Sequence, residues 1–338
     1  MMGLDIEEGK KYKGKIKVAE LEDGSEVEIP YFVMRGVKKH PVLLLNAAIH
    51  GDELNGVEVI MRLFEELNPM QIKGTIIGVP VVNVLAFRSR DRFDAIEKRD
   101  LNRKFPGKKN GNITEKIAYH FFNEFVKNAD FGIDLHAGMK GHLLLPHGRA
   151  RILKDYKPNL EYYQALGTDI IFYHEGEKGM LNIMAGKEGI PIVCFEIGEA
   201  DRLDEYYINE GIKAVKNFMR YFGMLDGLPE MPARQILLQG YIEVRANAGG
   251  IFYSGIKVGD VVKEGDIIGY IRKINGERVY LKAEKDSTVM GVRTLSAVRE
   301  GDPIAWMLSF ENAEILEIKK KVKTRRNKIL EKAEKFIR

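Results

Sequence analysis

Three apolar runs in this sequence end at ionisable side chains, and this feature constrains the fold more than any other. Residues 43–49 lead to His50, with Glu53 three positions later; residues 131–135 lead to His136, and residues 190–195 lead to Glu196. Apolar runs without alternation are typical of strands buried on both faces of a parallel sheet. Ligands bind at the carboxyl edge of such sheets. The sequence therefore predicts that these four side chains gather at one edge.

The region from about residue 40 to 225 alternates apolar strands with amphipathic helices. This alternation predicts an α/β fold with a mixed, mostly parallel sheet covered by helices, preceded by short strands within residues 1–34. We expect strands at 42–48, 75–82, 131–136, 142–146, 169–173 and 191–197, and helices at 53–67, 114–128, 157–166, 180–188 and 205–222.

Imidazole and carboxylate groups are ordinary zinc ligands, and three ligands with an open fourth position are typical of a catalytic zinc. With a helix beginning at Glu53, His50 and Glu53 would point at one ion. A second His-x-x-Glu, His174 with Glu177, shows that the spacing also arises by chance. Any one of these residues alone could be an ordinary surface residue after a strand. Their joint occurrence favours a metal site.

Four motifs carry a resemblance to a known family. They are His50-Gly-Asp-Glu53, Asp100-Leu-Asn-Arg-Lys-Phe-Pro-Gly107, Asp134-Leu-His136 and Phe195-Glu-Ile-Gly198, with Arg92-Phe93 ahead of the second. In this order they resemble the succinylglutamate desuccinylase/aspartoacylase family, a branch of the zinc carboxypeptidase-like hydrolases. The resemblance covers most of residues 35–310.

The resemblance implies a metal site and a base. His50, Glu53 and His136 would hold one zinc ion per chain. Asp100 would orient the imidazole of His50, as ligating histidines generally require. Glu196 would act as general base and then as general acid.

The resemblance also implies how substrate is bound. Arg92 would polarise the scissile carbonyl, although Arg88 and Arg90 lie close by in the sequence. Asn102 and Arg103 would bind a substrate carboxylate. Relatives often carry a substrate-binding Arg or Tyr before the base, whereas residues 178–184 here contain no Arg. The identity of the substrate is therefore left open.

Beyond residue 234 the pattern changes to short β-rich runs separated by turns. Residues 250–269 resemble the barrel-sandwich fold of biotinyl and lipoyl carriers. Such carriers hold their modified lysine within Met-Lys-Met or Asp-Lys-Ala. Lys282 and Lys285 match neither motif, so we expect the fold without a prosthetic group. The sequence thus divides into a catalytic domain at 1–226, a small all-β domain at 234–310 and a basic C-terminal helix or tail at 311–338.

The chain has 338 residues and a net charge of +4, but the positive charge is concentrated at one end. Residues 319–338 hold ten Lys or Arg and two Glu, so the other 318 residues carry −4. The tail could bind nucleic acid or an anionic surface. We favour instead a solvated helix docked by its apolar side, formed by Ile329, Leu330, Ala333, Phe336 and Ile337.

A single cysteine, Cys194, excludes a disulfide framework and suits a reducing compartment. The N-terminus has no signal-peptide pattern, and no apolar run approaches the roughly 20 residues that cross a bilayer. We therefore expect a cytoplasmic protein without a membrane partner, and the sequence does not decide whether it forms homo-oligomers.

The favoured function is a zinc-dependent deacylase that cleaves the amide, or an ester, of a small acylated amino acid or amine. One alternative is a carboxypeptidase that uses the same chemistry on peptide C-termini. Another is a non-catalytic, metal-stabilised binding scaffold, against which an intact Glu196 argues.

Overall fold

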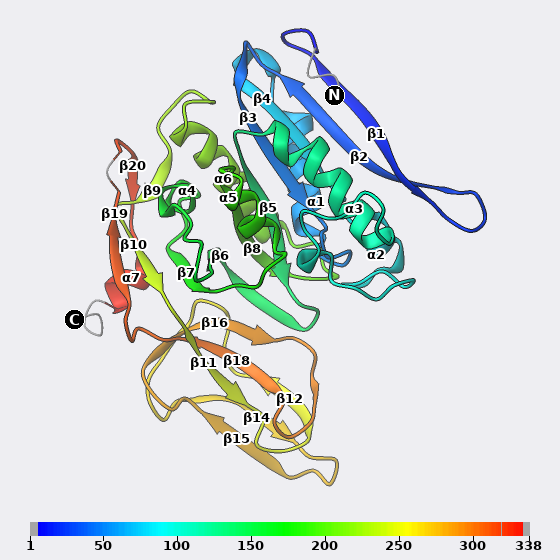
Figure 1. Cartoon of the computed structure of the whole chain (residues 1–338). Helices are drawn as coiled ribbons and strands as arrows, with labels where there is room; N and C mark the ends of the chain where they lie inside the picture. The colour runs from blue at the N-terminus through cyan, green and yellow to red at the C-terminus, as the bar shows by residue number, and fades with distance from the viewer. Residues whose placement is uncertain (1–5, 319, 334–338) are drawn as a thin grey trace.

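One mixed sheet of 14 strands runs through much of the protein (Figure 1). The structure is a computed structural model and describes residues 6–318 and 320–333. Its first elements are β1 (Lys11–Glu20), β2 (Glu26–Arg35), β3 (Lys38–Ala47), α1 (Asn55–Glu66), η1 (Pro69–Gln71), β4 (Lys73–Val79), α2 (Val84–Ser89), η2 (Leu101–Arg103), α3 (Ile113–Glu124), η3 (Val126–Asn128), β5 (Phe131–Gly138), β6 (His142–Ile152), α4 (Leu160–Gln164), β7 (Ile170–Glu175), α5 (Leu181–Lys187), β8 (Ile192–Glu199) and α6 (Glu205–Tyr221).

The later part of the chain is almost entirely β-structure. Its elements are β9 (Glu230–Pro232), β10 (Arg234–Leu238), β11 (Tyr241–Arg245), β12 (Gly250–Ser254), β13 (Val261–Val262), β14 (Ile267–Arg272), β15 (Arg278–Lys282), β16 (Ser287–Arg293), β17 (Ala297–Val298), β18 (Pro303–Leu308), β19 (Glu314–Glu317), β20 (Lys323–Arg325) and α7 (Lys328–Ala333).

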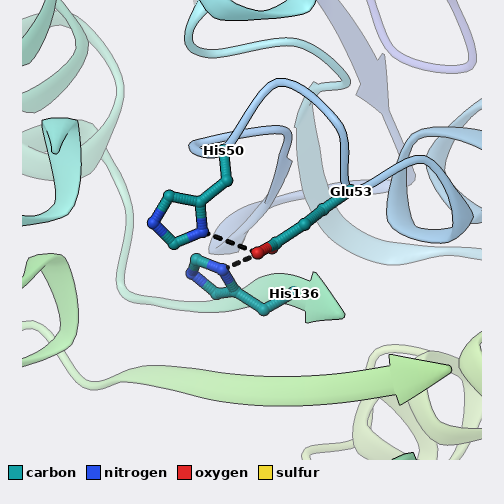
Figure 2. A group of neighbouring side chains, drawn as sticks. All are labelled: His50, Glu53 and His136. Carbon is teal, nitrogen blue, oxygen red and sulfur yellow. Dashed lines mark hydrogen bonds and ion pairs between the residues drawn. The ribbon is translucent and has the colours of Figure 1, made fainter. Parts of the chain in front are cut away.

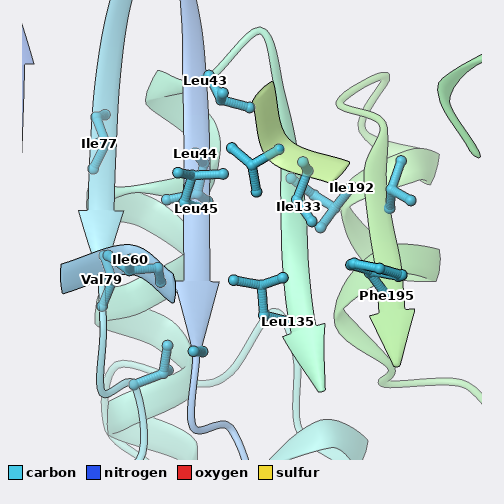
Figure 3. Close-up of a cluster of buried hydrophobic side chains, with 14 of the residues drawn as sticks. Leu43, Leu44, Leu45, Ile60, Ile77, Val79, Ile133, Leu135, Ile192 and Phe195 are labelled. Atoms are coloured by element: carbon cyan, nitrogen blue, oxygen red, sulfur yellow. The ribbon is translucent and has the colours of Figure 1, made fainter. Parts of the chain in front are cut away.

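The centre of the large sheet consists of the parallel strands β4, β3, β5 and β8, in that order. Every residue of β5 is buried, as expected of a strand covered on both faces. Leucine, isoleucine and phenylalanine side chains from these strands, among them Leu44, Ile133 and Phe195, form the core (Figure 3). Helices α1 and α6 contact each other and the central strands. The predicted mixed α/β sheet is therefore confirmed.

Several predicted boundaries were wrong. The helix expected from Glu53 begins at Asn55, so His50 and Glu53 lie together in the turn before it. Strand β5 ends at Gly138 instead of at residue 136, and β8 ends at Glu199 instead of at residue 197, because the pairing between them extends to these two residues.

Two further elements differ from the expectation. The strand expected at 142–146 extends to Ile152, because β7 pairs with its second half. Helix α2 was not predicted; it has only six residues and is capped by Asn83, whose side chain accepts a hydrogen bond from the backbone of Ala86.

The C-terminal strands are joined to the large sheet. Strand β16 pairs with β6, β18 pairs with β16, and β11 pairs with β18 (Figure 1). Strands β15, β14, β12 and β17 form a separate four-stranded sheet. The two groups enclose a core of their own that includes Phe252, Ile268, Ile271 and Met307. The boundaries at 226, 234 and 310 stay a prediction.

The last described residues return to the first part of the chain. Strand β10 pairs with both β7 and β19. In α7, Ile329 and Leu330 are buried against Ile236 and Leu238. Phe336 and Ile337, which we expected on the same apolar side, lie outside the described residues. Across residues 6–318 and 320–333, no helix is both long and apolar enough to cross a membrane.

The turn that carries His50 and Glu53 lies directly against α2. The backbone N–H of Glu53 donates to the carbonyl of His50 at 3.3 Å. A Cβ atom at Gly51 would lie 2.0 Å from the carbonyl carbon of Ala86 and 2.2 Å from the backbone nitrogen of Phe87. These are backbone atoms that cannot rotate away, so only glycine fits at position 51.

We predict that Gly51→Ala lowers the free energy of unfolding by about 1–3 kcal/mol, because the turn must move away from α2. Gly240→Ala is the matched control, since no atom lies within 4 Å of a Cβ atom there. The control should stay within about 0.5 kcal/mol of the parent protein. Chemical denaturation measures both, and equal stability of the two variants would contradict the close approach.

Candidate active site

His50, Glu53 and His136 form a buried cluster at the carboxyl ends of β3 and β5 (Figure 2). His50 and Glu53 come from the turn after β3, and His136 comes from β5, the neighbouring parallel strand. Nδ1 of His50 lies 2.7 Å from Oε1 of Glu53, and Nδ1 of His136 lies 2.7 Å from Oε2. The Glu53 carboxylate therefore bridges the two imidazoles. This confirms that the two strand ends meet.

A second layer of carboxylates lies behind the imidazoles. Nε2 of His50 is 3.3 Å from the Asp100 carboxylate, and Nε2 of His136 is 2.9 Å from that of Asp134. Asp134 also accepts a hydrogen bond from the side-chain amide of Asn46 at 2.6 Å. Both imidazoles thus direct Nδ1 toward the cluster and Nε2 toward a carboxylate, an arrangement that fixes ring orientation in metal sites.

The charges of the cluster are strongly coupled. Burial alone would raise the pKa of Glu53, but His50 and His136 outweigh it and hold the pKa far below its usual range. Burial alone would lower the pKa of His50, but Glu53 and Asp100 outweigh it and raise the pKa. The cluster therefore contains an ionised carboxylate and, beside it, two imidazoles that take up a proton more readily than a free imidazole does.

The donor set fits a zinc ion. One atom from each of His50, Glu53 and His136 can be chosen so that all three lie within 4.8 Å of one another. The three residues are between 2% and 4% exposed, so bulk water does not screen them. Two nitrogens and one carboxylate oxygen are ligands that zinc prefers. Within residues 6–318 and 320–333, this is the one group of three such side chains placed to hold a metal.

Glu196 lies beside the cluster on β8. It is buried and is the register partner of His136 on β5. Its Oε1 accepts a hydrogen bond from a guanidinium nitrogen of Arg149 at 2.9 Å. Glu196 is not one of the three clustered donors; it lines the cavity, and Arg149 holds its carboxylate.

Arg92 also reaches the cluster. One of its terminal nitrogens lies 3.3 Å from Nδ1 of His50 and 3.4 Å from Oε1 of Glu53; the other lies 3.5 Å from the Asp100 carboxylate. Arg92 lines the cavity, whereas its sequence neighbours Arg88 and Arg90 are exposed and do not.

Asn102 and Arg103 both lie in η2, which Asp100 caps. The side-chain oxygen of Asn102 accepts a hydrogen bond from the backbone of Leu181 at 2.9 Å. Arg103 donates to the Glu177 carboxylate at 2.8 Å. Both residues line the cavity, so all the predicted site residues except Asp100 reach it directly.

The cavity has a volume of about 460 Å³. Its walls come from both parts of the chain. The part before β9 contributes the residues described above together with others such as Arg151, His174 and Met180. Strands β11, β16 and β18 contribute five more, namely Tyr241, Glu243, Met290, Pro303 and Trp306. The aromatic ring of Trp306 packs against His142, and its indole N–H donates to Glu243 at 3.3 Å. A substrate in this cavity is therefore confined by the C-terminal strands.

Sequence reasoning missed several cavity residues. Asp134 was quoted only as part of a motif, although its position two residues before His136 puts both side chains on one face of the strand. Arg149 and Arg151 were missed because the predicted strand ended before them. His174 and Glu177, the second His-x-x-Glu, do not meet: His174 contacts Arg151, and Glu177 contacts Arg103.

The chain is similar to known proteins over much of its length. The model of the succinylglutamate desuccinylase/aspartoacylase catalytic domain matches residues 39–222. The N-alpha-acetyl-L-2,4-diaminobutyric acid deacetylase of Halomonas elongata is 27% identical over 277 residues, which are 78% of this chain and 81% of the relative.

Solved structures show the same fold. The ectoine utilization protein EutE (DoeB) of Ruegeria pomeroyi, in a product-bound structure, is 25% identical with a TM-score of 0.76, covering 88% of this chain and 95% of that one. A succinylglutamate desuccinylase from Silicibacter sp. TM1040 is 24% identical with a TM-score of 0.75 and the same coverage. Because the family model matches more than half of the chain, this protein belongs to the succinylglutamate desuccinylase/aspartoacylase family.

Proposed function

We propose that this protein is a zinc-dependent deacylase that hydrolyses the amide bond, or a corresponding ester, of a small N-acyl amino acid or N-acyl amine. The observation that carries the proposal is the buried His50–Glu53–His136 cluster in the wall of a cavity that also holds Glu196 and Arg92. Support also comes from the relative described as an N-alpha-acetyl-L-2,4-diaminobutyric acid deacetylase.

His50, Glu53 and His136 would hold one zinc ion, with Asp100 and Asp134 fixing the two imidazoles. When bound at such a site, zinc lowers the pKa of a coordinated water toward about 7 and polarises the substrate carbonyl. The protein's own contribution is to present three donors already converged and screened from solvent.

Glu196 would accept the proton of the attacking water and then pass it to the leaving amine. Arg149 holds the carboxylate in place for both steps through its 2.9 Å hydrogen bond. Arg92 would donate to the oxygen of the scissile carbonyl as negative charge develops on it, a form of stabilisation that is generally the largest single effect in acyl transfer. The family resemblance assigns the binding of an anionic substrate group to Asn102 and Arg103, which lie at η2.

We further propose that residues 234–310 form a barrel-sandwich-like domain that acts as a wall of the active site. Tyr241, Glu243 and Trp306 line the cavity, which supports this role. A wall at this position favours small substrates over long peptides, because a long chain needs an open path away from the scissile bond.

The metal assignment predicts about one zinc per chain in the purified protein. His50→Ala or His136→Ala should abolish both bound zinc and activity, because each removes one of three ligands. His174→Ala should leave the zinc content unchanged, since His174 contacts Arg151 rather than the cluster. Elemental analysis measures the metal. Loss of zinc from the His174 variant alone would mean that the wrong His-x-x-Glu was chosen.

The assignment of Glu196 predicts that Glu196→Gln keeps its zinc and loses activity. General acid–base catalysis contributes about 10²–10⁴-fold, so we expect kcat to fall by at least about 100-fold. Elemental analysis and steady-state kinetics on the same preparation separate the two roles. A variant that loses its zinc would make Glu196 a ligand instead of the base.

The substrate class is tested by competition at equal concentration between N-acetyl or N-succinyl amino acids and peptides of at least five residues. We expect faster release of the amine from the acyl amino acids, because the C-terminal strands confine the cavity. Amine release can be followed by mass spectrometry. Faster release of C-terminal residues from the peptides would instead establish a carboxypeptidase.

A further inference from the structure

The second His-x-x-Glu of the sequence contacts two cavity arginines. His174 on β7 is the register partner of Arg151 on β6, and its Nδ1 lies 3.1 Å from a guanidinium nitrogen of Arg151. Both residues line the cavity. Burial and the nearby Arg151 lower the pKa of His174 to about 3, so its imidazole is neutral and can accept this hydrogen bond.

Arg151 differs from the other cavity arginines in its partners. Arg149 is paired with Glu196 at 2.9 Å, Arg103 with Glu177 at 2.8 Å, and Arg92 with Glu53 at 3.4 Å. Arg151 makes its hydrogen bonds to His174 and to the carbonyl of Glu175, at 3.1 and 3.4 Å. In the described part of the chain, no carboxylate lies within 4 Å of its guanidinium.

A half-buried guanidinium without an anion is unfavourable in the free protein. Burial, with Arg149 close by, lowers the pKa of Arg151 to about 10, yet the group keeps its proton at neutral pH. Removing a charge from water costs free energy unless an opposite charge compensates it. A carboxylate that enters the cavity would supply that charge and could bind the guanidinium through two parallel hydrogen bonds.

We propose that Arg151 binds the carboxylate of the acylated amino acid, in place of Arg103, whose guanidinium already pairs with Glu177. We further propose that His174 is a positioning residue that orients the guanidinium of Arg151. This inference rests on the proposed function and names the feature by which substrate is selected. It also accounts for the absence of an arginine in residues 178–184. Arg151 on β6 occupies another part of the cavity wall and can perform the same task.

The inference is tested by binding rather than by turnover. The full-length Glu196→Gln protein, as purified, is titrated in a calorimeter with Nα-acetyl-L-2,4-diaminobutyrate and with the matched carboxamide, which lacks only the carboxylate charge. We expect the acid to bind about 10- to 100-fold more tightly than the amide, the range for a charge-assisted hydrogen bond.

Adding Arg151→Met to this protein should remove the preference, so that acid and amide bind equally weakly. Arg151→Lys should retain part of it, because the charge is kept and the planar fork is lost. If the preference survives Arg151→Met and disappears in Arg103→Met, the anchor is Arg103 and the inference is overturned. Failure of the Glu196→Gln protein to bind either compound also overturns it.

The positioning role of His174 is tested by two variants that differ in one property. His174→Gln keeps an acceptor for Arg151 and should retain most of the preference for the acid. His174→Leu removes the acceptor and should reduce the preference to nearly that of Arg151→Met. Equal effects of the two variants would assign His174 a packing role only.

The proposed function can fail separately from this inference. If the protein with Glu196 intact hydrolyses none of the acyl amino acids, but the preference for the acid depends on Arg151, the carboxylate site exists and the deacylase proposal is wrong. If hydrolysis occurs and the preference does not depend on Arg151, the deacylase proposal stands and the carboxylate site lies elsewhere.

Discussion

The Glu53 carboxylate, placed between two imidazoles, is the interaction on which the site depends. It is 2% exposed and lies 2.7 Å from a nitrogen of His50 and of His136. A buried carboxylate is costly unless it is paired, so the two histidines must be held in register with it. The parallel pairing of β3 with β5 supplies that register, because it brings the ends of both strands to one edge of the sheet. The tight turn at Gly51 then returns Glu53 toward His50.

Charges around this cluster are arranged in alternating sign. Asp100 and Asp134 lie behind the imidazoles, Arg92 lies between Glu53 and Asp100, and Asn46 supports Asp134. Each group thus has a partner within hydrogen-bond reach. Such a network keeps its geometry in a site of low dielectric, where an unpaired group would reorganise or take up a proton. The site is therefore organised before any substrate enters.

The sequence predicted well which ionisable side chains meet at the edge of the sheet, but it predicted the rest of the cavity wall poorly, and the difference has a physical cause. His50, His136 and Glu196 follow or lie within largely apolar runs, and parallel strands bring such positions to one edge. Arg149 and Arg151 lie on β6 beyond Pro146. Proline removes a backbone donor, and the pairing of β6 with β8 is irregular between Leu144 and His147. The apolar pattern ends there, although the strand continues through its pairing with β7.

The contribution of the C-terminal strands to the cavity could not be read from local sequence at all. Tyr241, Glu243 and Trp306 reach the cavity only because β16 pairs with β6 and β18 with β16, contacts between residues far apart in the chain.

Strand β6 has three neighbours. It pairs with β8, which carries Glu196, with β7, which carries His174, and with β16 of the C-terminal strands. The groups to which we assign the reaction come from the turn after β3 and from β5 and β8, whereas the groups that would select a substrate come from β6 and its other neighbours. Substitutions on β6, β7 or β11 can therefore change which amine or acyl group fits while the carboxylate bridge between the two imidazoles stays in place.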